Sequence, residues 1–183
     1  MKAAVIEEVG AAPHATALAD PAPTTDTQVV VRVEATALNA IDLHVAEGHH
    51  RAGPPKVPYV PGFEVVGTIT AGPDQGLRVH ATVPAGLVPG VNGGLAELLL
   101  TERAACIPVP DGLDSIAAAA IGAVGAGADL ALRKADLQAG ESVLVLGATG
   151  PLGAAAVQLA KLASRASPRN SSPSWRSSRS SSS

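Results

Sequence analysis

Short apolar segments, separated by proline and glycine clusters, fill about the first 110 residues of the chain. Their valine-rich, β-branched composition predicts strands at residues 2–6, 28–37, 63–71, 77–83 and 95–100. One short helix is predicted between them, at residues 41–47. Several short strands with turns at this spacing predict a small β-barrel or sandwich.

The pattern becomes helical after Asp111. Asp114 or Ser115 can cap a helix that begins at Ile116, and a second helix is predicted at about residues 125–134. Residues 142–146 are an apolar run typical of a buried strand, which a glycine-rich turn and an alanine-rich helix to about Leu162 follow. The chain is therefore predicted to contain a β-rich domain, a short α/β part and a disordered Ser/Arg tail, with bounds at residues 1–112, 113–163 and 164–183.

Composition limits the core and the cellular setting. Hydrophobic residues make up 46% of the chain but aromatic residues only 2%, so valine, leucine, isoleucine and alanine must form the core. The single cysteine, Cys106, excludes an internal disulfide and a cysteine-rich zinc site, and it is expected to be a buried apolar residue. We expect a cytoplasmic protein, because the N-terminus does not read as a signal peptide and the longest apolar run, residues 116–128, is too short to span a membrane.

The charge distribution is uneven. The net charge is −3, but residues 164–183 hold four arginines and no acidic residue, which leaves nine basic against sixteen acidic residues in the rest of the chain. An acidic body argues against specific nucleic-acid binding. A short Ser/Arg tract is more often disordered than functional.

The glycine-rich turn has the composition of a nucleotide site. It consists of Gly147, Ala148, Thr149, Gly150, Pro151, Leu152 and Gly153. A sharp turn from strand to helix favours glycine, and a pyrophosphate approaches a backbone that lacks Cβ atoms. The N–H groups and the positive end of the helix dipole then face the phosphate. The flanking strand and helix patterns favour a cofactor turn over a purely structural one.

The choice between NAD and NADP stays open at this point. Residues 164–173 contain no acidic residue for the ribose hydroxyls, and Arg165 and Arg169 suggest a 2′-phosphate if this stretch is folded. NADP is therefore the expected cofactor, with NAD as the alternative.

Several motifs together resemble the medium-chain dehydrogenase/reductase family. They are LNAIDLHVAEG at residues 38–48, VPGFEVVG at 60–67, GGLAE at 93–97, VPDG at 109–112 and the glycine-rich turn. The resemblance implies a mixed α/β chain, in which a GroES-like β-barrel precedes the opening strand, turn and helix of a Rossmann domain. It also implies a substrate cleft between the two domains.

The resemblance is closest to the zinc-independent, quinone oxidoreductase-like branch. Zinc-dependent members have cysteine where this chain has Asn39 and histidine where it has Phe63, and neither replacement can ligate zinc in that role. No metal site is expected. The cluster of His44, Glu47, His49 and His50 lacks the spacing of a helical zinc site.

The resemblance also supplies three candidate catalytic residues, Asn39, Asp42 and His44. Asn39 could donate a hydrogen bond to a carbonyl oxygen during hydride transfer, or it could simply cap the short helix. Asp42 is typical of the zinc-independent branch. His44 stands where zinc-dependent relatives have a proton relay, but it could equally be a surface residue. Glu64 is expected to support the barrel.

The expected function is NAD(P)H-dependent reduction of a quinone, an enone or another carbonyl. Because the helical pattern stops at Leu162 and 11 of the last 20 residues are serine, we expect a truncated or frameshifted chain that is inactive and is poorly soluble or a homodimer. One alternative is a non-enzymatic GroES-like module for binding or oligomerisation. Another is an alcohol dehydrogenase that has lost its zinc.

Overall fold

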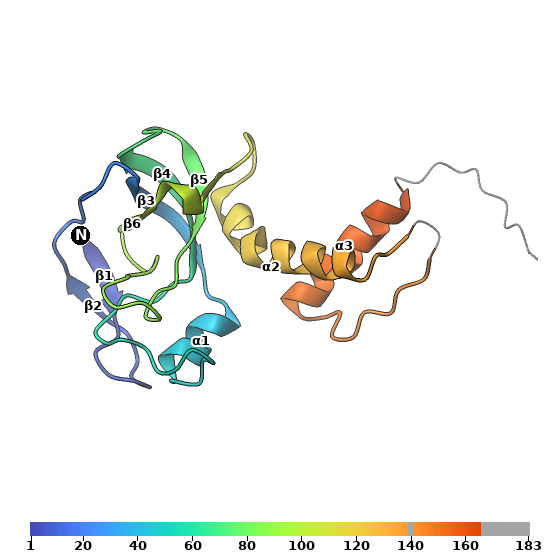
Figure 1. The fold of residues 1–183 in the computed structure, drawn as a ribbon, viewed down its shortest axis with the longest axis horizontal. Helices are drawn as coiled ribbons and strands as arrows, with labels where there is room; N and C mark the ends of the chain where they lie inside the picture. Colours follow the sequence, from blue (N-terminus) through green and yellow to red (C-terminus); the bar gives the residue numbers. More distant parts are fainter. Residues whose placement is uncertain (139–140, 166–183) are drawn as a thin grey trace, which may run out of the picture. The chain divides into compact units, whose positions relative to one another are not determined.

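A computed structural model describes residues 1–138 and 141–165, which divide into two compact units, Met1–Gly127 and the remainder from Ala128 onward. All seven strands that the structure describes lie in the first unit, α-helices complete the regular elements, and the predicted mixed α/β class is confirmed (Figure 1). The predicted domain boundary near residue 112 stays a prediction. Residues 164 and 165, assigned to the predicted tail, belong to the last helix, and the rest of the predicted tail, residues 166–183, lies outside the described residues.

The first unit is built on antiparallel sheets. A five-stranded sheet has the order β6-β3-β4-β5-β7, and a two-stranded sheet pairs β1 with β2. The bounds are β1 (Lys2–Val5), β2 (His14–Ala17), β3 (Gln28–Ala37), α1 (Ala40–Ala46), β4 (Glu64–Ala71), β5 (Arg78–Thr82), β6 (Leu98–Glu102), a 3₁₀ turn (Arg103–Ala105), β7 (Cys106–Pro108), α2 (Ser115–Lys134) and α3 (Pro151–Arg165).

Strand β7 was not among the five predicted strands, and β2 and β6 also differ from the sequence prediction. Strand β2 was not predicted, because its sequence HATA contains no valine, isoleucine, leucine or aromatic residue and its side chains are mostly exposed. Strand β6 begins at Leu98 instead of residue 95, because residues 95–97 bond to β1. The Ala4 N–H donates to the Leu95 carbonyl and the Glu97 N–H donates to the Lys2 carbonyl.

Aliphatic side chains form the main core, as the composition predicts. Most of its fully buried members come from β3, β4, β5 and β6, and they include Val29, Val31, Val65, Val79 and Leu99. Cys106 belongs to the same cluster, which confirms that it is a buried apolar residue. Burial raises the pKa of its thiol above the ordinary value.

Helix α2 is one continuous helix of 20 residues, so the prediction of two helices was wrong. Glycine in a helix interior costs only about 1 kcal/mol relative to alanine, and the glycines of α2 therefore do not break it. As predicted, Asp114 caps the helix, since its Oδ1 accepts hydrogen bonds from the N–H groups of Ile116 and Ala117 at 2.8 and 2.9 Å.

Helix α2 is also longer than the apolar run at residues 116–128, which on its own is too short to span a membrane. By length and composition alone this helix could cross a membrane, unlike the 13-residue run expected from the sequence. This is weak evidence, because core helices of soluble proteins pass the same test. Ala118 and Ala119 are buried against Val66 of β4, so this part of α2 covers the sheet.

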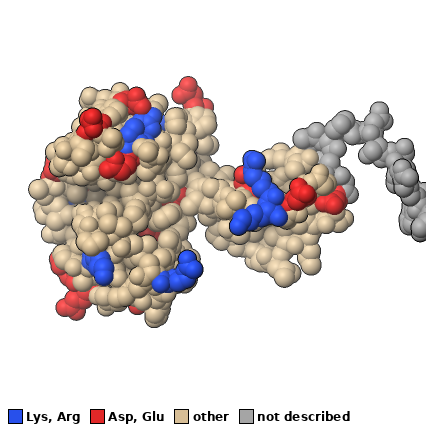
Figure 2. Space-filling model, in the orientation of Figure 1, with Lys and Arg blue, Asp and Glu red and all other residues tan. Residues whose placement is uncertain are grey.

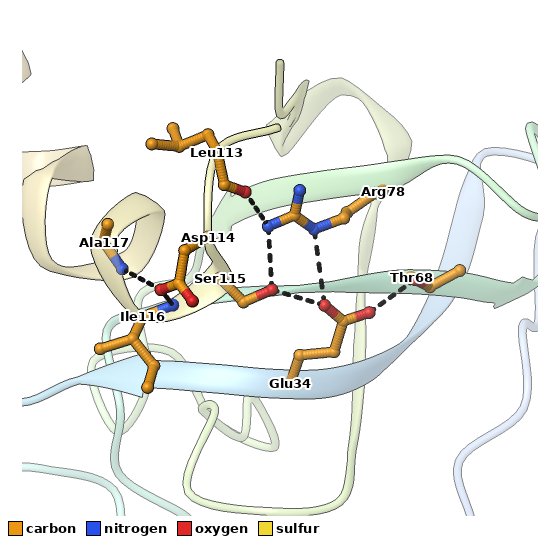
Figure 3. Close-up of polar contacts among 8 residues, drawn as sticks. All are labelled: Glu34, Thr68, Arg78, Leu113, Asp114, Ser115, Ile116 and Ala117. Atoms are coloured by element: carbon orange, nitrogen blue, oxygen red, sulfur yellow. Dashed lines mark hydrogen bonds and ion pairs between the residues drawn. The ribbon is translucent and has the colours of Figure 1, made fainter. Parts of the chain in front are cut away.

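The start of α2 is tied to the sheet by a polar cluster around Glu34 of β3 (Figure 3). The Glu34 carboxylate accepts hydrogen bonds from Thr68 and Ser115, each at 2.7 Å, and Arg78 lies 3.5 Å away. The Ser115 and Thr68 hydrogen bonds, with Arg78, hold the pKa of Glu34 below its ordinary value despite partial burial. This cluster anchors the helix.

The second unit contains α3 but lacks the predicted strand. Residues 141–145 have no strand pairing in the part of the chain that the structure describes, and Leu144 and Leu146 are each 84% exposed. A strand exists only where a neighbour satisfies its N–H and C=O groups, and no described segment pairs with this one. Val143 and Val145 instead line a hollow of about 360 Å³ together with Val157 of α3.

Candidate functional site

The predicted residue Asp42 organises the loop in front of β4. Its carboxylate is buried, and Oδ2 accepts the backbone N–H of Asn39 at 2.8 Å. Its Oδ1 accepts the N–H groups of Gly62 and Phe63, at 3.2 and 2.8 Å. Asp42 therefore joins the start of α1 to the segment that precedes Glu64.

Asn39 is the residue before α1, and its partly buried side chain extends to Glu64 at the start of β4. Its backbone is extended, with φ −110° and ψ 164°, as expected of a residue that precedes a helix. Its Nδ2 donates to Oε1 of Glu64 at 2.7 Å. The structure thus places the Asn39 side chain beside Glu64. The hydrogen bonds of Asp42 hold the backbone at Asn39 and the backbone of the segment just before Glu64.

Glu64 is the centre of this polar cluster and is 0% exposed. Its second oxygen, Oε2, lies 2.8 Å from Nε2 of His80 and accepts the backbone N–H of Ala123 at 2.7 Å. Burial raises the pKa of Glu64, but the hydrogen bonds from His80, Asn39 and Ala123 outweigh it. The pKa of Glu64 consequently lies below its ordinary value of 4.5, and the group is ionised at neutral pH.

His80 is a member of the cluster that sequence reasoning missed. It lies on β5 between the buried core residues Val79 and Ala81, so its side chain points to the opposite face of the sheet. In the register of β4 and β5, His80 is opposite Val66, two positions from Glu64. Only this pairing, which no local pattern encodes, brings the two side chains together.

The lowered pKa of Glu64 predicts how stability depends on pH. In the unfolded chain the pKa has its ordinary value of 4.5, so the contribution of the ionised carboxylate is fully present above that pH. It is lost as the pH falls through the lower pKa of the folded state. We expect the stability difference between the wild-type protein and Glu64→Gln to shrink below pH 4.5 in urea unfolding measured at several pH values. A difference that grows as the pH falls would contradict this assignment.

The third predicted residue, His44, is not part of the cluster. Its side chain is exposed on α1, and no hydrogen bond or ion pair reaches its ring within the described residues. Its neighbours pair elsewhere, since His49 lies 3.4 Å from Glu47 and the His50 ring accepts the N–H of Ala52. Residues 1–138 and 141–165 contain no group of three or more His, Cys, Asp or Glu side chains that could hold a metal ion.

The glycine-rich turn of the second unit leads directly into α3. Gly147 has a φ of +73°, a region that favours glycine, and the N–H of Gly150 bonds to its carbonyl at 3.0 Å. A Cβ on Gly153 would collide with the same carbonyl oxygen, so only glycine allows this close approach. Ala148 and Thr149 are exposed, and the N-terminus of α3 is therefore open to a ligand.

Charged side chains of both signs lie on the surface. On the face drawn in Figure 2, acidic and basic side chains are scattered over the first unit among uncharged residues. The candidate functional residues are the polar cluster around Glu64 in the first unit, on the sheet face opposite the main core, and, separately, the glycine-rich turn of the second unit.

Comparisons with known proteins agree with these features. Residues 25–111 match the alcohol dehydrogenase GroES-like domain. The chain is 35% identical to quinone oxidoreductase from Sus scrofa over 137 residues, which cover 74% of this chain and 41% of that protein. It is 33% identical over 142 residues to the chloroplastic NADPH-dependent alkenal/one oxidoreductase of Arabidopsis thaliana, covering 73% of this chain and 37% of that protein.

A solved structure extends the similarity beyond the barrel. Quinone oxidoreductase from Thermus thermophilus, determined alone and with NADPH, superposes with a TM-score of 0.77 at 37% identity. The match covers 90% of this chain and 51% of that one, so this chain spans about half the length of such relatives or less. Residues 25–111 thus match the alcohol dehydrogenase GroES-like domain, and about nine-tenths of the chain is similar in fold to a solved quinone oxidoreductase.

Proposed function

We propose that this chain supplies the barrel and the cofactor turn of a zinc-independent, cytoplasmic, NADPH-dependent oxidoreductase that reduces a quinone, an enone or another carbonyl. The turn at residues 147–153 carries the proposal, since its backbone suits a nucleotide phosphate. The relatives named for quinone and alkenal reduction, two of them with NADPH in their names or titles, support the substrate class and the cofactor.

The turn fits the phosphates of the cofactor in three respects. Gly147 adopts the positive φ of a sharp turn, and Gly153 allows the start of α3 to lie against the turn backbone. The exposed residues Ala148 and Thr149 leave room for a ligand in front of this 15-residue helix. Its N-terminus carries positive dipole charge and unpaired N–H groups, which favour an anion. NADPH bound here would supply the hydride.

The barrel contributes residues that face the substrate. We propose that the Asn39 amide donates a hydrogen bond to the substrate carbonyl oxygen, where negative charge develops during hydride transfer. Asp42 holds the loop that carries Asn39. The exposed His44 lies two residues after Asp42 on α1 and is proposed to contact cofactor or substrate. The side chains Asn39 and Phe63 support chemistry without zinc.

Binding of NADPH is the first test. We expect saturable binding to the wild-type chain, followed by NADPH fluorescence, and a dissociation constant at least about tenfold higher in Thr149→Asp, which corresponds to about 1.4 kcal/mol. An added carboxylate repels the phosphates of NADPH but stabilises the N-terminal end of a helix. Weaker NADPH binding by Thr149→Asp would therefore not reflect unfolding of α3. Parallel titration with NADH tests the preference for NADP.

A matched substitution controls for added charge. Ala12→Asp places the same carboxylate on an exposed loop residue of the first unit and is expected to leave NADPH binding unchanged. Equal dissociation constants for the wild type and Thr149→Asp would argue against the turn as the site. If the wild type shows no saturable binding, a GroES-like module for binding or oligomerisation is favoured instead, and sedimentation would then test for a homodimer.

A further inference from the structure

The buried carboxylate of Glu64 joins four elements of the first unit. Glu64 begins β4, Asn39 precedes α1, His80 lies on β5 and Ala123 lies on α2. The three hydrogen bonds that reach the carboxylate measure 2.7 to 2.8 Å. A charge in such a place needs several donors, because burial without them would drive it to its neutral form.

The charge of Glu64 decides how its partners are oriented. An ionised carboxylate only accepts hydrogen bonds, so Asn39 must present its amide nitrogen and His80 must carry a proton on Nε2. The side-chain amide of asparagine otherwise has two ends of nearly equal shape. Glu64 therefore selects one of the two orientations of Asn39.

Helix α2 holds the other side of the carboxylate. The N–H of Ala123 lies in the interior of α2, yet it donates to Glu64 at 2.7 Å. The preceding residue, Gly122, packs so closely on His80 that a Cβ there would collide with Nε2 of the ring. The close approach of the helix backbone thus fixes both His80 and the second oxygen of Glu64.

We propose that Glu64 is a positioning residue, which holds the Asn39 amide for contact with a substrate oxygen while His80 and the backbone of α2 hold Glu64. The nitrogen of Asn39 carries two hydrogens, and among the described residues only Glu64 accepts one of them. The other can donate to a ligand. The substrate contact rests on the function proposed above, whereas the orientation of Asn39 does not.

The side-chain amide signals of Asn39 test this proposal directly. The chain has only three asparagines, Asn39, Asn92 and Asn170, so these signals are readily assigned by NMR. In the wild-type protein without cofactor we expect a through-hydrogen-bond coupling between Asn39 Nδ2 and the Glu64 carboxyl carbon. In Glu64→Gln, we expect a change in the Asn39 signals larger than that of any other side-chain amide.

Glu34→Gln is the matched control, because Glu34 also joins the sheet to α2 but does not touch Asn39. It is expected to leave the Asn39 signals in place. The positioning role is overturned if the wild-type protein shows no such coupling, or if Glu64→Gln leaves the Asn39 signals unmoved in a folded spectrum. The coupling measurement keeps the test decisive even if Glu64→Gln does not fold.

A second readout separates this proposal from the proposed function. Addition of NADP⁺ and cyclohexanone, a simple carbonyl probe, is expected to shift the Asn39 signals in the wild type and in Glu34→Gln, but less in Glu64→Gln. Equal shifts in all three proteins would overturn the positioning role. Failure of the proposed function would appear separately, as absence of NADPH binding in the fluorescence titration.

Discussion

Replacement of Glu64 by alanine is expected to lower the free energy of unfolding by at least about 3 kcal/mol, because each buried donor left without an acceptor costs about 1–3 kcal/mol. The substitution leaves His80, Asn39 and the N–H of Ala123 without the acceptor that all three share. Water cannot replace the acceptor without entering a site in which Glu64 is fully buried. Urea unfolding monitored by far-UV circular dichroism measures the difference.

Glu34→Ala is the comparison for this substitution. Glu34 also accepts hydrogen bonds from two side chains and lies beside an arginine, but its side chain is 32% exposed. Solvent can replace its partners, so the expected loss is about 1 kcal/mol or less. Similar losses for Glu34→Ala and Glu64→Ala would show that the buried cluster has no special weight in the stability of the barrel.

Gly67→Ala is expected to cost about 3 kcal/mol, at the upper end of what overpacking typically costs. Gly67 lies on β4 opposite Val33 of β3. A Cβ at this position would collide with the carbonyl oxygen of Arg32 and lie 2.8 Å from Cγ1 of Val31. Both obstacles belong to the neighbouring strand, which cannot move without disturbing the core. Chemical unfolding measures the loss.

A glycine of α2 serves as the control, because an added Cβ there would not collide with a neighbouring strand. Gly125 lies in the helix interior, and a Cβ there would meet only the side chain of Ile121, which is 56% exposed and free to adjust. Because alanine has the higher helix propensity, Gly125→Ala is expected to be neutral or to stabilise the chain by up to about 1 kcal/mol. If both alanine substitutions change stability equally, close packing between β3 and β4 is not the reason for glycine at position 67.

The sequence predicts those elements whose side chains follow a local pattern. Strand β3 appears with its predicted bounds because its valine-rich sequence favours a strand locally, whereas β2 has no such composition and exists through pairing with β1. The strand predicted at residues 142–146 has the right residues but no partner among the described strands. Local pattern alone therefore misplaces elements whose formation depends on a neighbour.

Some candidate site residues lie in local sequence motifs, whereas others are brought together only by the fold. Asn39, Asp42 and the glycine-rich turn lie in short motifs, and the backbone of Gly147 and Gly153 has the geometry that those motifs predict. His80 could not be found, because its role depends on the register between β4 and β5 and on the approach of Gly122. His44 belongs to a motif, yet it takes no part in the buried cluster.

The contacts of α2 with the sheet determine how far a recombinant fragment of the first unit must extend. A recombinant fragment that stops at residue 112 would remove Ser115 from Glu34, Ala118 and Ala119 from Val66, and the N–H of Ala123 from Glu64. The cut would uncover an apolar surface and an ionised carboxylate together. We therefore expect the smallest fragment of this chain that folds on its own to extend into the middle of α2, to about Gly127, well past the region that matches the GroES-like domain.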